Sequence, residues 1–219
     1  MAGTRIEKKK GLRADAEQNR ERIVKAAQAL FAERGIDVTM EEIAREAGVG
    51  VATLYRRYPT RAELLAGAFE DKMWIFANGA QRALQDPDPW HGFCRFITSL
   101  CAMQSNDRGF NDVLTMTFPK VTGFESARNE AYVAFVELIE RAQEVGALRS
   151  DFVPEDLIIL LMANAGVVTA AGKAAPRSAP RLIAYLLEAF AAPGRDALPP
   201  PPSYRQITNA LMRLSDGSS

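Results

Sequence analysis

The sequence contains few of the residues from which catalytic and metal-binding sites are usually built. Its 219 residues include one histidine and two cysteines. It has no glycine-rich phosphate loop and no serine in a nucleophile-elbow context, so no constellation of residues predicts an enzyme. Two cysteines do not form a disulfide framework, which favours a reducing compartment. We therefore expect a binding protein that needs neither a cofactor nor a metal ion.

Long hydrophobic runs and a net charge are also missing. The longest apolar run, Leu157 to Val168, is interrupted by Asn164 and is too short to span a bilayer. The N-terminal residues lack the apolar core of a signal peptide. The chain carries 27 basic and 27 acidic residues and is formally neutral. These absences predict a cytoplasmic protein that does not enter a membrane.

The charge is nevertheless distributed unevenly along the chain. Residues 1–65 hold 13 Lys or Arg and 10 Asp or Glu, a net charge of +3, which leaves −3 for the remainder. The first thirteen residues alone carry +4. Such an asymmetry indicates an end that faces a polyanion, although charge runs are more often solvated surfaces. We expect residues 1–14 to form a basic disordered arm.

Apolar residues recur at helical spacing throughout, without strand-like alternation, and this pattern predicts an all-α fold. Near the N-terminus it predicts three helices, over about residues 15–34, 39–48 and 51–58. Gly35 is suited to end the first helix, because glycine tolerates the left-handed conformation. Thr39 begins the second helix and has a glutamate three residues later, which is the pattern of a capping box.

The second and third of these helices are joined by a tight glycine turn and form a helix-turn-helix, whose second helix fits the major groove of DNA. Leu54 is spaced to pack inward, which leaves its neighbours facing outward. Arginine can bind guanine bidentately, and threonine or valine methyl groups can contact thymine. Tyrosines, Arg61 and the helix N-terminus at Thr39 suit phosphates. The residues predicted to contact DNA are Thr39, Val51, Ala52, Thr53, Tyr55, Arg56, Arg57, Tyr58 and Arg61.

An alternative interpretation is a small-molecule-binding or enzymatic helical protein whose helix-turn-helix is only structural. Arginines on a surface helix are usually just solvated, and Tyr58 is equally suited to a hydrophobic core. Arg56 and Arg57 beside Tyr55, together with the basic N-terminus, favour DNA binding, because a purely structural element would not need them.

Residues 22–65 closely resemble the DNA-binding region of the tetracycline-repressor (TetR) family of bacterial regulators. Gly50, Tyr58 and Arg61 stand where the family commonly has Ser or Thr, Phe, and Lys. The matching positions are Ala27, Leu30, Phe31, Gly35, Thr39, Ile43, Ala44, Ala47, Gly48, Val49, Thr53, Leu54, Tyr55, Tyr58 and Arg61.

This resemblance implies an all-helical homodimer with two domains. The helix-turn-helix DNA-binding domain would span residues 15–66, and a larger helical ligand-binding and dimerisation domain would span residues 67–219. Family members bind an inverted-repeat operator in double-stranded DNA, most repress transcription, and a small molecule usually releases the operator.

The C-terminal part of the sequence fits this expectation. The segment from residue 155 to 172 is apolar on nearly every side, so it must be buried all round, against its own core and against a partner chain. A second apolar stripe lies in the helix predicted over residues 179–192. The residues predicted to form the dimer interface are Leu161, Gly166, Ala170, Leu182, Ile183, Leu186 and Phe190.

Aromatic and methionine side chains between residues 93 and 164 are able to line an apolar pocket with few polar groups. Each of them alone is more often plain core. Together they predict a small hydrophobic effector, aromatic or acyl. The candidate pocket residues are Phe93, Phe96, Met103, Phe110, Met116, Phe118, Tyr132, Phe135, Met162 and Asn164.

His91, Cys94 and Cys101 fall on one face of a predicted helix. That arrangement suits a soft metal ion or a thiol sensor. Free cysteines more often behave as small buried hydrophobic residues, which is the interpretation we prefer.

Overall fold

The computed structural model describes residues 3–115, 122–172, 174–194, 196–203, 205–207 and 209. The only paired extended backbone among them is a single bridge between Leu148 and Ala191, and the all-α fold predicted from the sequence is confirmed. None of the described helices combines the length and hydrophobicity needed to cross a membrane. The helices are α1 (Gly3–Arg34), α2 (Met40–Ala47), α3 (Val51–Arg57), α4 (Arg61–Leu84), α5 (Pro89–Asn106), α6 (Arg108–Thr115), α7 (Thr122–Glu144), α8 (Glu155–Ala171) and α9 (Ser178–Phe190).

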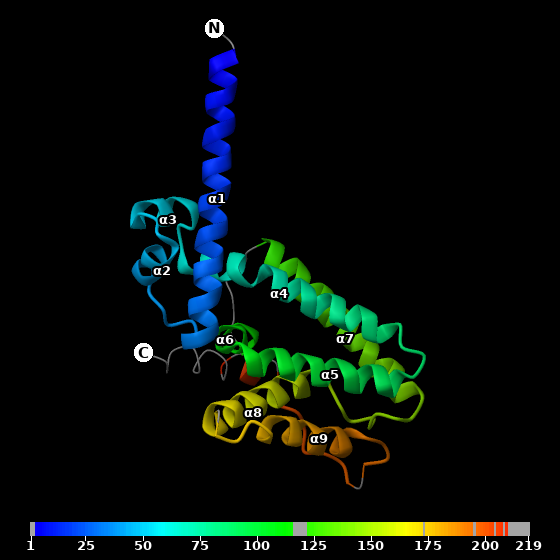
Figure 1. Ribbon diagram of the computed structural model, residues 1–219. Coiled ribbons are helices and arrows are strands. Elements are labelled where there is room, and N and C mark those ends of the chain that lie inside the picture. Colours follow the sequence, from blue (N-terminus) through cyan, green and yellow to red (C-terminus); the bar gives the residue numbers. More distant parts are fainter. Residues whose placement is uncertain are drawn as a thin grey trace.

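Helix α1 is longer than we predicted. It begins at Gly3 and projects well beyond the neighbouring helices (Figure 1). The expectation of a disordered arm is therefore wrong for residues 3–14, which continue the helix. These residues include three Lys and two Arg, with one Glu, one Leu and one Ala, all good helix formers, and no proline interrupts the sequence before α2.

The signals at the helix ends are confirmed. Gly35 and Gly48 have φ of 78° and 62°, in the left-handed region where helices commonly end. The Thr39 hydroxyl accepts a hydrogen bond from the Glu42 amide at 3.2 Å, and the Glu42 carboxylate accepts one from the Thr39 amide at 2.9 Å. This complete capping box begins α2, and α3 follows after Gly50.

Two hydrophobic clusters hold the helices together. The first joins α1–α3 and the N-terminal half of α4 to α6 and α7. In it the ring of Phe69 stacks on Phe31 with centroids 5.8 Å apart and lies 6.2 Å from Phe110. Helix α6 fits closely here, because a Cβ at Gly109 would lie 2.7 Å from the Phe31 Cβ. The core of the N-terminal head, which we define as helices α1–α3, therefore runs across the domain boundary predicted at residue 66.

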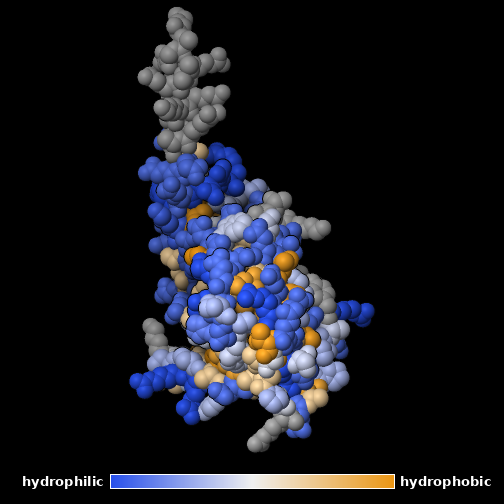
Figure 2. Space-filling view, turned by 90° about the vertical axis from the view of Figure 1, so that its right-hand side faces the viewer, coloured by the Kyte–Doolittle hydropathy of each residue, from blue (hydrophilic) through white to orange (hydrophobic). Residues whose placement is uncertain are grey.

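The second cluster joins the C-terminal half of α4 to α5, α7, α8 and α9. Phe93 lies at its centre, with ring centroids 6.3 Å from Phe135 and 5.5 Å from Phe152. Helices α4 and α7 lie side by side, and α8 and α9 pack on the other side of α5 (Figure 1). Figure 2 shows mostly hydrophilic residues over the head, and hydrophobic residues at the surface of the C-terminal part.

The predicted dimer residues divide between the interior and the surface. Leu161 and Ile183 are each 4% exposed and belong to the second cluster, so their assignment to a dimer interface is wrong. Helix α8 is apolar all round, and its sequence pattern therefore could not show which face packs on the chain's own core. Gly166 and Ala170 are exposed. The half-buried members of the set are Leu182, Leu186 and Phe190.

Candidate functional site

Helix α3 has one side chain in the core and most of the others at the surface. Leu54 is fully buried in the first cluster. Val51 and Tyr55 are 39% and 41% exposed, and Arg56 and Arg57 are also exposed. Of the remaining predicted contacts, Ala52 and Thr39 are exposed, and Thr53 and Arg61 are half-buried. Helices α2 and α3 lie on one side of α1, and α4 leads away towards the C-terminal helices (Figure 1).

Two arginines from neighbouring helices hold the α2–α3 pair in place. Arg22 of α1 donates a hydrogen bond to the Gly48 carbonyl at 2.8 Å, at the turn between α2 and α3. Arg61 of α4 donates one to the Val38 carbonyl at 2.6 Å, just before α2. Sequence reasoning missed Arg22, because its partner lies 26 residues away and no local pattern connects them.

The two arginines of α3 have different surroundings. The Arg57 guanidinium lies 3.9 Å from the Glu17 carboxylate of α1, which also pairs with Arg20 at 3.3 Å. The Arg56 guanidinium makes no hydrogen bond or ion pair within the described part of the chain. Exposed ion pairs such as Arg57–Glu17 are weak and easily exchanged. Arg56 is therefore the freer of the two cations, a difference that the sequence did not indicate.

Tyr58 is a core residue, and its prediction as a phosphate contact is wrong. Its side chain is only 7% exposed and belongs to the first cluster. It lies against α4, where a Cβ at Gly67 would be 3.0 Å from the tyrosine ring. Burial raises the pKa of Tyr58, and the nearby positive charge of Arg20 opposes the rise. The chain turns at Pro59 and directs this ring back onto the helix that follows.

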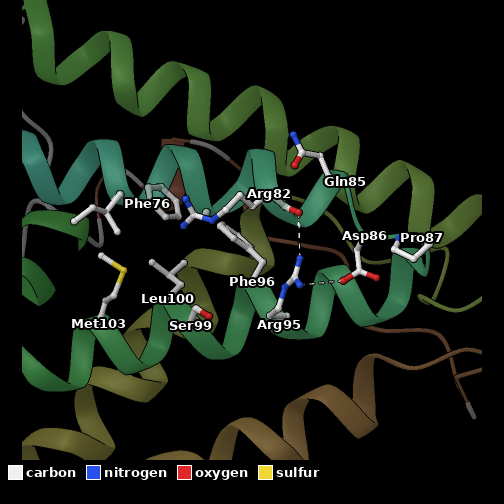
Figure 3. Close-up of a pocket in the computed structure, with 12 residues that line it drawn as sticks. Phe76, Arg82, Gln85, Asp86, Pro87, Arg95, Phe96, Ser99, Leu100 and Met103 are labelled. Carbon is white, nitrogen blue, oxygen red and sulfur yellow. Dashed lines mark hydrogen bonds and ion pairs between the residues drawn. The ribbon is translucent and has the colours of Figure 1, made fainter.

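A groove of about 570 Å³ lies between α4 and α5 (Figure 3). Its volume is in the range of small-molecule sites in proteins. The end nearer α6 is apolar and the end at the α4–α5 turn is polar. The apolar end is lined by Ile75, Phe76, Leu100 and Met103 and the polar end by Gln85, Asp86 and Arg95. The middle is lined by Gly79, Phe96, Ser99 and the Arg82 guanidinium, which points back along α4 towards Phe76 (Figure 3).

The polar end is organised by the buried carboxylate of Asp86. It lies 3.2 Å from the Arg95 guanidinium and 2.8 Å from His91 Nδ1. Burial on its own would raise the pKa of Asp86, but hydrogen bonds from His91 and the Asp88 amide, with the charge of Arg95, lower it below its ordinary value. Asp86 therefore remains a carboxylate and offsets the charge of Arg95.

Few of the predicted pocket residues line this groove. Phe96 and Met103 do so. Phe93 and Phe135 fill the second cluster, Phe110 lies in the first, and Tyr132 points outward at 55% exposure. These four do not line this groove, because helical spacing identifies a buried face but not an empty space beside it. Met162 is half-buried, and Met116 and Phe118 lie outside the described residues.

Asn164 belongs to a buried polar pair rather than to the groove. Its amide donates to Gln104 Oε1 at 2.6 Å and to the Cys101 carbonyl at 3.3 Å. Gln104 in turn donates to the Leu161 carbonyl at 3.0 Å. These bonds join α5 to α8 inside the core.

The histidine and the cysteines do not come together as a metal site. Within the described ranges, no three His, Cys, Asp or Glu side chains are grouped so that they could hold a metal ion. His91 is hydrogen-bonded to Asp86. Burial raises the pKa of Cys94 to about 11 and that of Cys101 to about 12. Both thiols are therefore protonated near neutral pH, which disfavours a reactive thiol sensor.

The all-helical fold, with an exposed second helix of a helix-turn-helix, defines the class of helix-turn-helix transcriptional regulators. Residues 23–68 match the family described as Bacterial regulatory proteins, tetR family. Residues 88–189 match the family described as Transcriptional regulator SbtR-like, C-terminal domain. The two matches together cover most of the chain, and the protein belongs to the TetR family of transcriptional regulators. The resemblance found in the sequence is confirmed.

Individual relatives agree with this assignment. An HTH-type transcriptional regulator of Staphylococcus aureus is 38% identical over 66 residues, which are 30% of this chain and 36% of that protein. The chain thus spans about a third of the length of the curated relatives it matches. The TetR regulatory protein of Mycobacterium vanbaalenii is 26% identical, with a TM-score of 0.50 over 83% of this chain and 99% of the other.

A more distant solved structure shares the fold. FadR from Bacillus subtilis, solved in complex with stearoyl-CoA, has a TM-score of 0.61 over 78% of this chain and 97% of the other. At 15% identity this likeness shows the fold alone.

Proposed function

We propose that this protein is a homodimeric repressor that binds an inverted-repeat operator and leaves it when a small ligand binds. The observation that carries the proposal is the surface of α3, where Leu54 anchors the helix and Val51, Tyr55, Arg56 and Arg57 face solvent. A short helix with this exposure suits the major groove. As a repressor it acts in the cytoplasm, by binding rather than by catalysis.

Within the helix-turn-helix we propose a division between base and phosphate contacts. Arg56 is the base-reading residue, because its guanidinium is unpaired among the described residues and free to bind guanine. Tyr55, Arg61 and the N-terminus of α2 at Thr39 contact phosphates, which fix orientation without reading sequence. Arg57 joins them when the weak pair with Glu17 exchanges for a phosphate.

The proposed dimer interface is the outer face of α8 and α9. Gly166 and Ala170 are exposed there, and a Cβ at Gly166 would have no described atom within 4 Å. Ile159 and Tyr185 are 44% and 57% exposed on the same two helices. Small residues flanked by exposed apolar ones suit close helix packing, and a two-fold axis through this face would pair with an inverted repeat.

The effector is expected to bind in the C-terminal domain. The 570 Å³ groove between α4 and α5 is the candidate site, since its apolar half accommodates a hydrophobic molecule. FadR, which has the same fold, is known with stearoyl-CoA bound, so the fold is compatible with an apolar ligand. Helix α4 connects this groove to the head. A ligand that binds more tightly to a dimer whose two α3 helices are wrongly spaced for the two operator half-sites would release the operator.

Selection of bound sequences from a random DNA pool tests the proposal. We expect an inverted repeat bound by one dimer, measured by fluorescence anisotropy and sedimentation. Arg56→Ala should cost about 1–3 kcal/mol of operator affinity and relax preference at one base pair of each half-site. Arg128→Ala, an exposed arginine of α7 outside the helix-turn-helix, serves as the control. Failure of the pool to yield a shared motif would rule out sequence-specific binding.

A further inference from the structure

Gly79 marks a space that the folded chain leaves open. A Cβ at Gly79 would have only one neighbour within 4 Å among the described residues, Arg82 Nη2 at 3.9 Å. At Gly67 of the same helix, by contrast, a Cβ would lie 3.0 Å from the Tyr58 ring. Glycine in a helix interior is less stable than alanine. Gly79 forms part of the groove wall, where a missing side chain lets a bound molecule approach the backbone closely.

The groove carries one uncompensated positive charge. The Arg95 guanidinium is held by the Asp86 carboxylate at 3.2 Å and by the Arg82 carbonyl at 3.1 Å. The Arg82 guanidinium has neither a hydrogen bond nor an ion pair with any other described residue. Two guanidinium groups against one carboxylate leave a single positive charge, which lies on Arg82 beside Gly79. Gln85 and Ser99 add neutral hydrogen-bonding groups beside it.

The apolar end fixes the orientation and approximate length of an occupant. Phe76 stacks on Phe96 with ring centroids 5.5 Å apart, and with Leu100 and Met103 they form an apolar wall (Figure 3). The Arg82 guanidinium lies beside Gly79, four residues after Ile75 on α4, which corresponds to roughly 6 Å along a helix. A molecule with an apolar body of that length would place its other end at Arg82.

We infer that the groove between α4 and α5 binds an amphiphilic monocarboxylate, with its carboxylate at Arg82 and its apolar body along Phe76, Leu100 and Met103. The inference deepens the proposed function and rests on it, since it names the class of the effector. The single uncompensated charge favours a monoanion, because a carboxylate adds a charge-assisted hydrogen bond to the exposed Arg82 guanidinium that a neutral ligand lacks, and a multiply charged ligand exceeds the available cations. A purely hydrophobic molecule, which the sequence predicted, would contact the apolar end but would make no hydrogen bond to the polar groups of the groove.

The test compares each acid with its uncharged amide. The full chain without DNA is titrated calorimetrically with octanoate and octanamide, and with phenylpropanoate and phenylpropanamide. Each pair has matched shape and differs in charge. We expect the acid to bind about three- to tenfold more tightly, the range for one exposed charge-assisted hydrogen bond. Arg82→Gln should reduce this ratio to about one, whereas Arg128→Gln on α7 should leave it unchanged.

A second variant tests the position of the site. Gly79→Leu places a side chain in the groove, where its Cβ has only Arg82 Nη2 within 4 Å, and should weaken binding of both acid and amide by at least about tenfold. Asn78→Leu, at an exposed position one residue earlier, is the matched control. Equal affinity of acid and amide in the wild type, or undiminished binding to Gly79→Leu, would overturn the inference. Absence of binding together with a changed dimer in Gly79→Leu would also overturn it, because the groove would then be a protein interface.

Operator release is measured separately, by fluorescence anisotropy with the selected DNA. Acid binding that follows the expected variant pattern but leaves DNA binding unchanged would support the groove and refute the ligand-release part of the proposed function. Release that persists in Gly79→Leu would refute the groove and leave the proposed function standing.

Discussion

Two glycine-to-alanine substitutions should change stability in opposite directions. Both glycines lie in helices, yet their surroundings differ. A Cβ at Gly109 of α6 would lie 2.7 Å from the Phe31 Cβ, 2.8 Å from the Phe69 ring and 2.9 Å from the Phe31 carbonyl oxygen. A Cβ at Gly79 of α4 would have a single described neighbour, 3.9 Å away. The same chemical change therefore meets a packed interior at one position and open space at the other.

The magnitudes follow from two opposing effects. Alanine in a helix interior is favoured over glycine by about 1 kcal/mol, so Gly79→Ala should raise the free energy of unfolding by about that amount. Gly109 lies in the first turn of α6, where this gain is smaller, and overpacking costs about 1–3 kcal/mol. The contacts at Gly109 include backbone, which cannot rotate aside, so we expect a net destabilisation of about 1–2 kcal/mol.

Urea denaturation of both variants, at one protein concentration, measures these differences. In thermal melts Gly79→Ala should gain about 2–4 °C and Gly109→Ala should lose a similar or larger amount. A Gly109→Ala variant as stable as Gly79→Ala would show that α6 is not tightly packed between α1 and α4. The description of the first cluster as one continuous core would then be wrong.

Four further substitutions test other parts of the protein. Tyr58→Phe should leave operator affinity within about twofold of wild type, because the side chain is buried, whereas Tyr55→Phe should weaken specific and random DNA about equally in anisotropy titrations. Gly166→Asp should convert the dimer to monomers in sedimentation and abolish operator binding with it, and a monomer that retains full affinity would contradict the proposed interface. The Thr39 amide, with the Arg34 guanidinium, holds the pKa of Glu42 at about 2. Because this pKa is lower in the folded than in the unfolded protein, ionised Glu42 stabilises the fold. That contribution to the free energy of unfolding is complete above the ordinary glutamate pKa and is lost as pH falls from about 5 to about 2. Glu42→Gln keeps the capping box and should flatten the dependence of unfolding on pH in this window, which acid titration of both proteins would measure.

The features that could be predicted from the sequence, such as helix ends, depend on residues that lie within a few positions of each other along the chain. Gly35 and Gly48 mark helix ends because only glycine enters the left-handed region easily. The capping box of Thr39 depends on a residue three positions away. Leu54 was predicted to be buried because it is spaced to pack inward, and it is buried. The helix-turn-helix is thus encoded almost entirely in local sequence.

The remaining features depend on which faces of different helices meet. Arg82 and Gly79 were not predicted to line a ligand site, because they contribute only where α4 and α5 lie antiparallel. The candidates chosen from aromatic character mostly fill the core instead. Leu161 and Ile183 were assigned to the wrong side of their helices for a related reason. Helices that are apolar on several faces do not specify their orientation by pattern alone.

The two arginine hydrogen bonds around the α2–α3 pair set the smallest segment of this protein that could be transferred to another regulator with its DNA-binding orientation intact. Arg22 reaches the Gly48 carbonyl from one side and Arg61 reaches the Val38 carbonyl from the other. A chimaera that grafts only α2 and α3 onto another regulator would lose both, and the graft would tilt as its new neighbours dictate. The similarity to the DNA-binding family model begins at Ile23, one residue after Arg22. Recombination at that boundary would keep every proposed base-contacting side chain. It would nevertheless remove the hydrogen bond from Arg22 to the Gly48 carbonyl, one of the two that orient α2 and α3.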